Sequence, residues 1–233
     1  MANSNVTLVV DVRGLDGLSY GAEVERRVLV VDDLRIEERE KEGARIVGHA
    51  AVFNSLSEDL GGFRELIAPG AFAEAIGRDD VRALFNHDSN IVLGRSTSGT
   101  LKLSEDTRGL LSEIHLPDTQ QARDLATLMK RGDITQMSFA FAVRKEDQDW
   151  KKNGDGPWER TIRKVARLYD VSPVTYPAYP QTDSAVRCMK EFEAAAAQAQ
   201  RAADEAAAGG LTTQTAGAVL VQRQRLRMLE TGL

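Results

Sequence analysis

The side chains best suited to chemistry in this sequence are a few histidines, one cysteine and a serine set in an apolar strand. His49 and His115 each lie in or beside strand-like letters and suit structural roles. His87 differs, because it ends the apolar run 81–86 and is followed by Asp88. Strand ends on a rigid scaffold hold reactive groups firmly and leave them accessible. His87 is therefore the histidine best placed for chemistry.

Ser138 lies in the run 134–143, ITQMSFAFAV, which has the composition of a strand. Side chains alternate between the two faces of a strand, so one face carries Met137, Phe139 and Phe141 and indicates a core. Ser138 lies on the other face, among small or polar neighbours. Its ordinary role would be a hydrogen bond to the backbone. The alternative is an exposed, reactive hydroxyl that the apolar face anchors.

Several other kinds of chemistry lack their motifs here. There is no H-E-x-x-H, no cysteine pair and no second histidine at ligand spacing, which argues against a dedicated metal site. A phosphate-binding G-x-x-x-x-G-K-[ST] loop and a G-x-S-x-G nucleophile elbow are also missing. Cys188 lies at the start of a long helix, beyond the strand-rich region, and suits a structural role. The sequence predicts no cofactor and no metal.

The composition limits the possible environments and partners. The chain has 233 residues, 42% of them hydrophobic, which suffices for one domain of about 150–180 residues plus appendages. A net charge of −5 gives no general attraction to nucleic acid or to acidic membranes. A single cysteine suits a reducing cytosol. The first residues lack the pattern of a signal peptide, and no apolar run could span a bilayer. We expect a soluble intracellular protein with no nucleic-acid or membrane partner.

Short strand-like runs separated by turns dominate the chain from Arg26 onward. They predict a β-dominated α+β fold, a mainly antiparallel sheet or a closed β-barrel flanked by helices. The runs cover residues 27–36, 45–53, 63–67, 81–86, 99–105, 109–116, 134–143 and 158–171.

Two helices interrupt the strands and a helical extension follows them. Residues 69–77 predict a short helix, and 117–133 a clearer one, with Asp118 or Thr119 as N-cap and Gly132 as its end. Past the proline-rich stretch, an Ala-rich helix, a Gly-Gly break and a short basic helix follow. Such a helix cannot build its own core. The predicted organisation is a lead-in at 1–25, a domain at 26–186 and a helical tail at 187–233, which could bind a partner.

Four segments, in this order, resemble the prohead (capsid-maturation) proteases of tailed bacteriophages. They are GHAAVFNSLSEDLGGFRELIAPGAFAEAI, DVRALFNHDSNIVLGRSTSGTLKLSEDTRGL, LPDTQQARDLATLMKRGDITQMSFAFAV and LYDVSPVTYPAYPQTD. The resemblance covers about Arg26 to Arg187. It implies a serine endopeptidase with a fold similar to the herpesvirus assemblin proteases, a small, mostly antiparallel β-barrel wrapped by helices. It also implies a catalytic histidine at His87 and a nucleophilic serine at Ser138.

Elementary chemistry agrees with this assignment. A serine hydroxyl becomes a useful nucleophile only when a base such as His87 takes its proton, and the base needs a third group to orient it. In assemblin-like enzymes the third group is a histidine after the serine, but no histidine follows Ser138 here. The phage resemblance points instead to Asp170, with Asp88 and Asp133 as alternatives. The turn at Gly94 and Arg95 could hold an oxyanion donor, although a solvated turn is an equally good interpretation.

The sequence therefore predicts a phage serine endopeptidase acting inside the immature prohead, in the bacterial host cytoplasm. Its implied partners are the major capsid protein with its scaffold (delta) segment, and further copies of itself. Its implied substrates are that segment and the protease itself. The competing hypothesis is a non-enzymatic assembly or scaffold factor that retains the protease fold.

Overall fold

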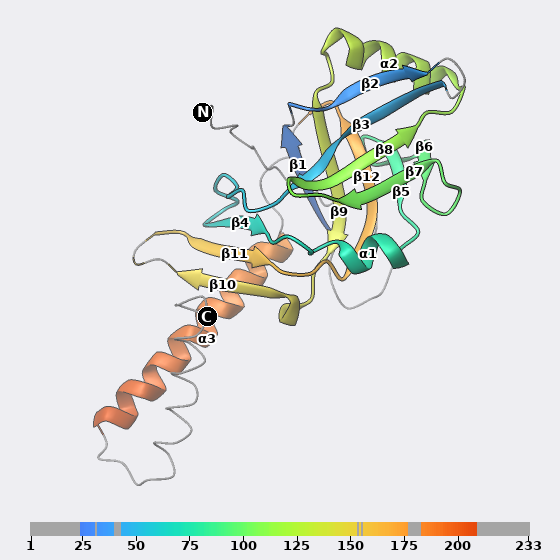
Figure 1. The fold of residues 1–233 in the computed structure, drawn as a ribbon. Helices are drawn as coiled ribbons and strands as arrows, with labels where there is room; N and C mark the ends of the chain where they lie inside the picture. Colours follow the sequence, from blue (N-terminus) through green and yellow to red (C-terminus); the bar gives the residue numbers. More distant parts are fainter. Residues whose placement is uncertain are drawn as a thin grey trace.

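The computed structural model describes residues 24–30, 32–39, 43–152, 154, 156–176 and 183–208. Over these ranges the chain forms twelve strands, three α-helices and one short 3-10 helix, η1 (Lys145–Asp147), a β-dominated α+β fold (Figure 1). Residues 1–23 of the predicted lead-in and 209–233 of the predicted tail lie outside the described residues, and the last lead-in residue, Glu25, begins the first strand.

The largest sheet contains five strands, and its second strand, β9, carries Ser138. Its spatial order is β1 (Glu25–Val30), β9 (Gln136–Ala142), β12 (Arg167–Val174), β5 (Arg82–Phe85) and β6 (Asp88–Arg95). Neighbours are antiparallel except β12 and β5, which run parallel. Because β5 and β12 are parallel, the end of β5 lies beside the end of β12.

Two smaller sheets complete the β structure. The four-stranded sheet is antiparallel and follows the order β2 (Arg35–Arg39), β3 (Gly43–Val52), β8 (Gly109–His115) and β7 (Leu101–Glu105). The three-stranded sheet follows the order β10 (Gln148–Lys152), β11 (Trp158–Ile162) and β4 (Phe63–Ile67), with β11 and β4 parallel. None of these three sheets closes on itself within the described residues, so the expected closed barrel is not confirmed.

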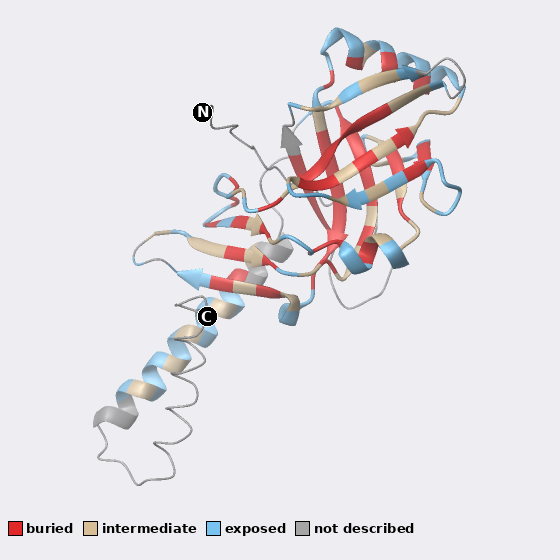
Figure 2. Cartoon of the chain, viewed as in Figure 1, coloured by how far each residue is buried: buried red, intermediate tan, exposed pale blue. Residues whose placement is uncertain are grey.

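One apolar core joins the five-stranded and four-stranded sheets. Phe139 and Phe141 of β9 stack at 4.9 Å between ring centroids, and Phe72 meets Phe139 edge-on at 5.6 Å. Ile46 of β3 and Ile114 of β8 belong to the same buried cluster. Much of the length of the strands in these two sheets is coloured as buried in Figure 2. Fully buried aromatic rings each remove a large apolar area from water, so this cluster holds β9 rigidly.

The two predicted helices of the domain are present. Helix α2 (Gln120–Arg131) begins after Thr119, whose side chain accepts a hydrogen bond from the Ala122 N–H, and ends at Gly132 in the left-handed conformation. These are the caps that the sequence predicts. Helix α1 (Ala73–Arg78) starts four residues later than the run 69–77 and extends one residue past it.

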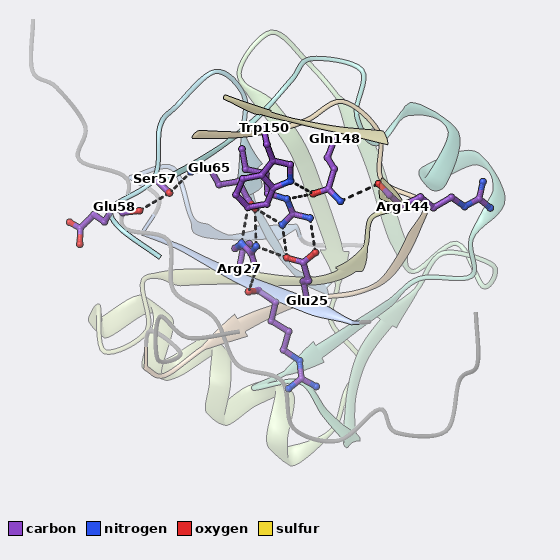
Figure 3. Close-up of polar contacts among 10 residues, drawn as sticks. Glu25, Arg27, Ser57, Glu58, Glu65, Arg144, Gln148 and Trp150 are labelled. Atoms are coloured by element: carbon purple, nitrogen blue, oxygen red, sulfur yellow. Dashed lines mark hydrogen bonds and ion pairs between the residues drawn. The ribbon is translucent and has the colours of Figure 1, made fainter. Parts of the chain in front are cut away.

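A buried network of charges joins the edge strand β1 to the three-stranded sheet (Figure 3). Arg160 of β11 bonds Glu25 at 2.6 Å and Glu65 at 2.7 Å, and Arg27 bonds the same two carboxylates at 2.6 and 2.8 Å. Two positive and two negative groups compensate each other, which is the condition for keeping charges out of water. The Arg160 guanidinium also lies 5.7 Å from the Trp150 ring centroid.

Helix α3 (Asp183–Ala208) begins against the three-stranded sheet and then leaves it (Figure 1). Met189 is buried with Trp150 and Phe63, and the Phe192 ring lies 6.0 Å from that of Trp150. Residues 193–204 are mostly exposed. None of the helices in the described ranges has both the length and the apolar character that crossing a membrane requires.

Candidate active site

Ser138 lies on β9, with its side chain on the face opposite the aromatic core. Met137 and Phe139, its chain neighbours, are fully buried in that core. Across the sheet, Ser138 is in register with Val28 of β1 and Ser172 of β12. The alternation that the sequence predicts is therefore present. The expected exposure is wrong, because Ser138 has 0% of its surface exposed.

His87 occupies a tight turn between β5 and β6. Phe85 and Asp88 pair across the hairpin, which leaves a two-residue loop of Asn86 and His87. Both loop residues have positive φ, 54° and 57°, the pattern of a type I′ hairpin. Asparagine tolerates this conformation, but glycine is usual at the second position and histidine pays a steric cost there.

Asn86 fastens this turn to the end of β12. Its side-chain oxygen accepts a hydrogen bond from the Thr175 N–H at 2.8 Å, and its amide nitrogen donates to the Thr175 hydroxyl at 3.1 Å. The Asn86 N–H donates to the Pro173 carbonyl at 3.0 Å. Three hydrogen bonds thus fix the position of His87 relative to the strand that carries Asp170.

The three predicted residues meet in a continuous chain of hydrogen bonds. The Ser138 hydroxyl lies 2.6 Å from His87 Nε2, and His87 Nδ1 lies 2.6 Å from Asp170 Oδ1. The side chains of His87 and Asp170 are only 9% and 6% exposed, so little water competes for these bonds. Asp170 lies on β12, next to β9, and His87 reaches both from the adjoining turn.

This arrangement can activate a hydroxyl. With Asp170 accepting from Nδ1–H, the Nε2 lone pair is free to receive the Ser138 proton. Because Ser138 is solvent-excluded, a substrate carbonyl can reach its Oγ only after neighbouring groups move.

The other sequence candidates lie in different surroundings. Asp88 accepts a hydrogen bond from the Asn90 N–H at 2.8 Å, and Asp133 pairs with Arg131 at 3.1 Å. His49 is held between Asp33 and Asp106. His115 is the last residue of β8, which belongs to the four-stranded sheet. The side chain of Cys188 is outside the described set.

The suggested oxyanion turn is otherwise engaged. The Arg95 N–H donates to the Thr100 hydroxyl at 2.9 Å, and the Arg95 guanidinium pairs with Asp80. A Cβ added at Gly94 would lie 2.9 Å from the Thr100 carbonyl oxygen, so this glycine serves close backbone packing. Both groups lie on β6, at the far edge of the sheet from β9.

Two residues at the site were not identified from the sequence. Ser172 donates to Asp170 Oδ1 at 2.8 Å, and Asn86 fastens the turn. Strand alternation could have suggested Ser172, since it follows Asp170 by two positions and shares its face. For Asn86, the only indication in the sequence of a role at the site is that it precedes His87.

No three His, Cys, Asp or Glu side chains among the described residues are grouped so as to hold a metal ion. The site joins a serine, a histidine and an aspartate in that order by hydrogen bonds, on a β-dominated α+β scaffold. This is the arrangement of a candidate serine hydrolase.

The chain belongs to the caudovirus prohead serine protease family, whose model matches residues 32–196. The prohead protease of Enterobacteria phage HK97 is 32% identical over 150 residues, which cover 63% of this chain and 60% of that protein. The match thus spans less than two thirds of that relative's length. Among solved structures, the bacteriophage T4 capsid assembly protease is similar with a TM-score of 0.44 and 9% identity, over 73% of this chain and 99% of that one.

Proposed function

We propose that this chain is a serine endopeptidase with Ser138 as nucleophile, His87 as general base and acid, and Asp170 as the group that orients His87. The observation that carries the proposal is the pair of 2.6 Å contacts from Ser138 to His87 and from His87 to Asp170. Membership of the prohead serine protease family supports the same chemistry.

The proposed reaction has two halves. Ser138 Oγ attacks the scissile carbonyl while His87 Nε2 takes the hydroxyl proton, and His87 then returns that proton to the leaving amine. The resulting acyl-enzyme is hydrolysed by a water molecule that His87 deprotonates in turn. Asp170 keeps the proton on Nδ1 and stabilises the imidazolium that forms in both halves.

The proposed substrates are the scaffold (delta) segment of the phage capsid protein and the protease itself, cleaved inside the immature prohead. The name of the phage HK97 relative, prohead protease, supports this setting. Removing an internal scaffold would make assembly irreversible and clear the interior for DNA.

Co-expression with the phage's major capsid protein, followed by mass spectrometry of the products, tests the proposal. We expect shortened capsid protein with the natural chain and none with Ser138→Ala. Ser112→Ala is the matched control, because Ser112 is equally buried but donates to the Gly48 carbonyl in another sheet. Capsid maturation with Ser138→Ala would favour the non-enzymatic assembly factor.

The same experiment tests the third residue. Asp170→Asn removes charge and orientation but spares nucleophile and base, so cleavage should slow strongly and remain detectable. Unchanged turnover in Asp170→Asn, with a large loss in Asp88→Asn, would reassign the third position.

A further inference from the structure

Ser172 lies beside the candidate triad without being part of the reaction just described. It is fully buried on β12, directly in register with Ser138. Its hydroxyl donates to Asp170 Oδ1 at 2.8 Å and lies 3.4 Å from His87 Nδ1. The oxygen that accepts from His87 therefore accepts from Ser172 as well.

We propose that Ser172 is a positioning residue, which fixes the Asp170 carboxylate so that Oδ1 faces His87. This role rests on the proposed peptidase function and deepens it. Ser172 touches neither the nucleophile's oxygen nor a substrate and acts through Asp170 alone.

The hydrogen bonds that Asp170 Oδ1 accepts support this role. An ionised carboxylate only accepts, so both His87 Nδ1–H and the Ser172 hydroxyl must be donors toward it. Two donors on one oxygen, from different directions, restrict rotation of the carboxylate about its last bond. Asp170 has 4% of its surface exposed, so water cannot easily replace a missing donor. Hydrogen bonds to a charged group are also among the stronger ones.

Alternative roles for the Ser172 hydroxyl fit the geometry less well. The Nδ1 proton is already committed to Asp170 at 2.6 Å, which leaves the 3.4 Å approach to Nδ1 without a proton to share. A role limited to filling space would not need the oxygen. Alanine, which lacks only that oxygen, would fill the same strand position almost as well.

The test measures kcat and KM for the natural chain, Ser172→Ala and Ser172→Thr on a peptide spanning a cleavage site mapped by the co-expression experiment. Losing a hydrogen bond to a charged group should lower kcat in Ser172→Ala on the order of 10-fold, with KM unchanged. Ser172→Thr keeps the hydroxyl and should recover most of the rate. Ser112→Ala, the equally buried control, should leave kcat unchanged.

A double-mutant cycle with Asp170→Asn then identifies the partner. If Ser172 acts through Asp170, adding Ser172→Ala to Asp170→Asn should change kcat less than about twofold. Additive losses, or equal kcat in Ser172→Ala and Ser112→Ala, would overturn the positioning role. Full cleavage by Ser138→Ala would instead contradict the proposed peptidase function itself. The failure of the positioning role and the failure of the peptidase function are therefore distinguishable.

Discussion

His87 occupies a backbone conformation that a bulky side chain rarely adopts. At φ 57°, in the second position of a two-residue turn, glycine would be the usual choice. A non-glycine residue held in such a region costs roughly 1–3 kcal/mol, and such residues cluster at functional sites. The positive φ of His87 is thus a conformational cost located at the proposed site, and the contacts with Ser138 and Asp170 remain the support for its role.

Replacing His87 with glycine separates the turn from the chemistry. His87→Gly accepts the positive φ, so the hairpin should keep its geometry while the base is lost. Cleavage should fall on the order of 10⁴-fold, measured as the initial rate on the mapped peptide, with an unchanged circular dichroism spectrum. Asn54→Gly is the control at another positive-φ turn residue and should keep full activity. A rate within tenfold of the natural chain would rule out His87 as the base.

Single candidate residues can be proposed from the sequence, whereas their contacts and their burial depend on the fold. Ser138, His87 and Asp170 could each be proposed from a strand end or a strand face, together with the family resemblance. Their contacts join residues 51 and 83 positions apart, so only the fold reveals them. The complete burial of Ser138 was not foreseen, because alternation predicts which face a side chain lies on and not what covers that face.

Among the secondary-structure elements, the β5–β6 hairpin matters most for the site, because its turn carries His87. Asn86 fastens that turn to the residues after β12, so Asn86→Ala should loosen His87 without removing any proposed triad member. Small misplacements of a catalytic group are costly, and we expect kcat to fall on the order of 10-fold.

The control for this change is Asn54→Ala. Asn54 is also an exposed asparagine at positive φ, 52°, and should suffer a similar conformational cost, but it lies outside the site. Equal melting temperatures for the two variants, with a rate loss only in Asn86→Ala, are the expected outcome. Equal rates in both variants would contradict the role of Asn86 in holding the turn that carries His87.

Edge strand β1 depends on the buried network for its attachment to the three-stranded sheet. Burial alone would raise the pKa of Glu25, but the guanidinium groups of Arg160 and Arg27 outweigh it and lower that pKa from 4.5 to about 2. A carboxyl whose pKa is lower in the folded state stabilises the fold above its unfolded pKa. The stabilisation is lost as the pH falls from about 4.5 toward 2, and amounts to about 3 kcal/mol.

Glu25→Gln should therefore lower the free energy of unfolding most at neutral pH. The difference from the natural chain, measured by urea denaturation, should shrink as the pH falls below 4.5 and nearly vanish near pH 2. Glu74→Gln is the control, since Glu74 forms a solvent-exposed pair with Lys164 and should matter little at any pH. A difference that stays constant with pH would show that Glu25 contributes through packing rather than charge.

The elements themselves were predicted where their signals are local. The N-cap at Thr119 and the end at Gly132 bound helix α2 because capping depends on neighbouring residues only. The run 27–36 proved to be two strands in different sheets, and β6 and β10 were missed. Partners far along the chain decide those pairings. The expected closed barrel is not confirmed in the described residues, and barrel closure likewise depends on the register between distant strands.

For the molecule as a whole, helix α3 raises the question of where the folded domain ends. The predicted boundary after Val186 falls within this helix, yet Met189 and Phe192 beyond it pack on the three-stranded sheet. The family match ends nearby, at residue 196. The exposed, Ala-rich remainder of α3 is then the part best suited to bind a partner, as the sequence suggests for the tail.

Two truncations distinguish the packed start of α3 from its exposed remainder. A chain ending at Ala196 keeps Met189 and Phe192 and should retain its melting temperature and its cleavage rate. A chain ending at Arg187 uncovers Trp150 and Phe63 and should lose roughly 2–5 kcal/mol of stability. Phe192→Ala in the full-length chain is the matched control and should reproduce part of that loss.

The Ala196 truncation also tests whether the chain beyond residue 196 acts as an interaction arm, a segment that binds a partner in the assembling shell. If the distal helix and tail bring the protease into the assembling shell, this form should cleave the peptide in trans at the normal rate but be packaged in fewer copies per prohead. Quantitative mass spectrometry of purified proheads gives the copy number. Normal packaging would refute the arm. A lost cleavage rate would instead show that the exposed part of α3 supports the folded domain, even though residues 193–204 are mostly exposed.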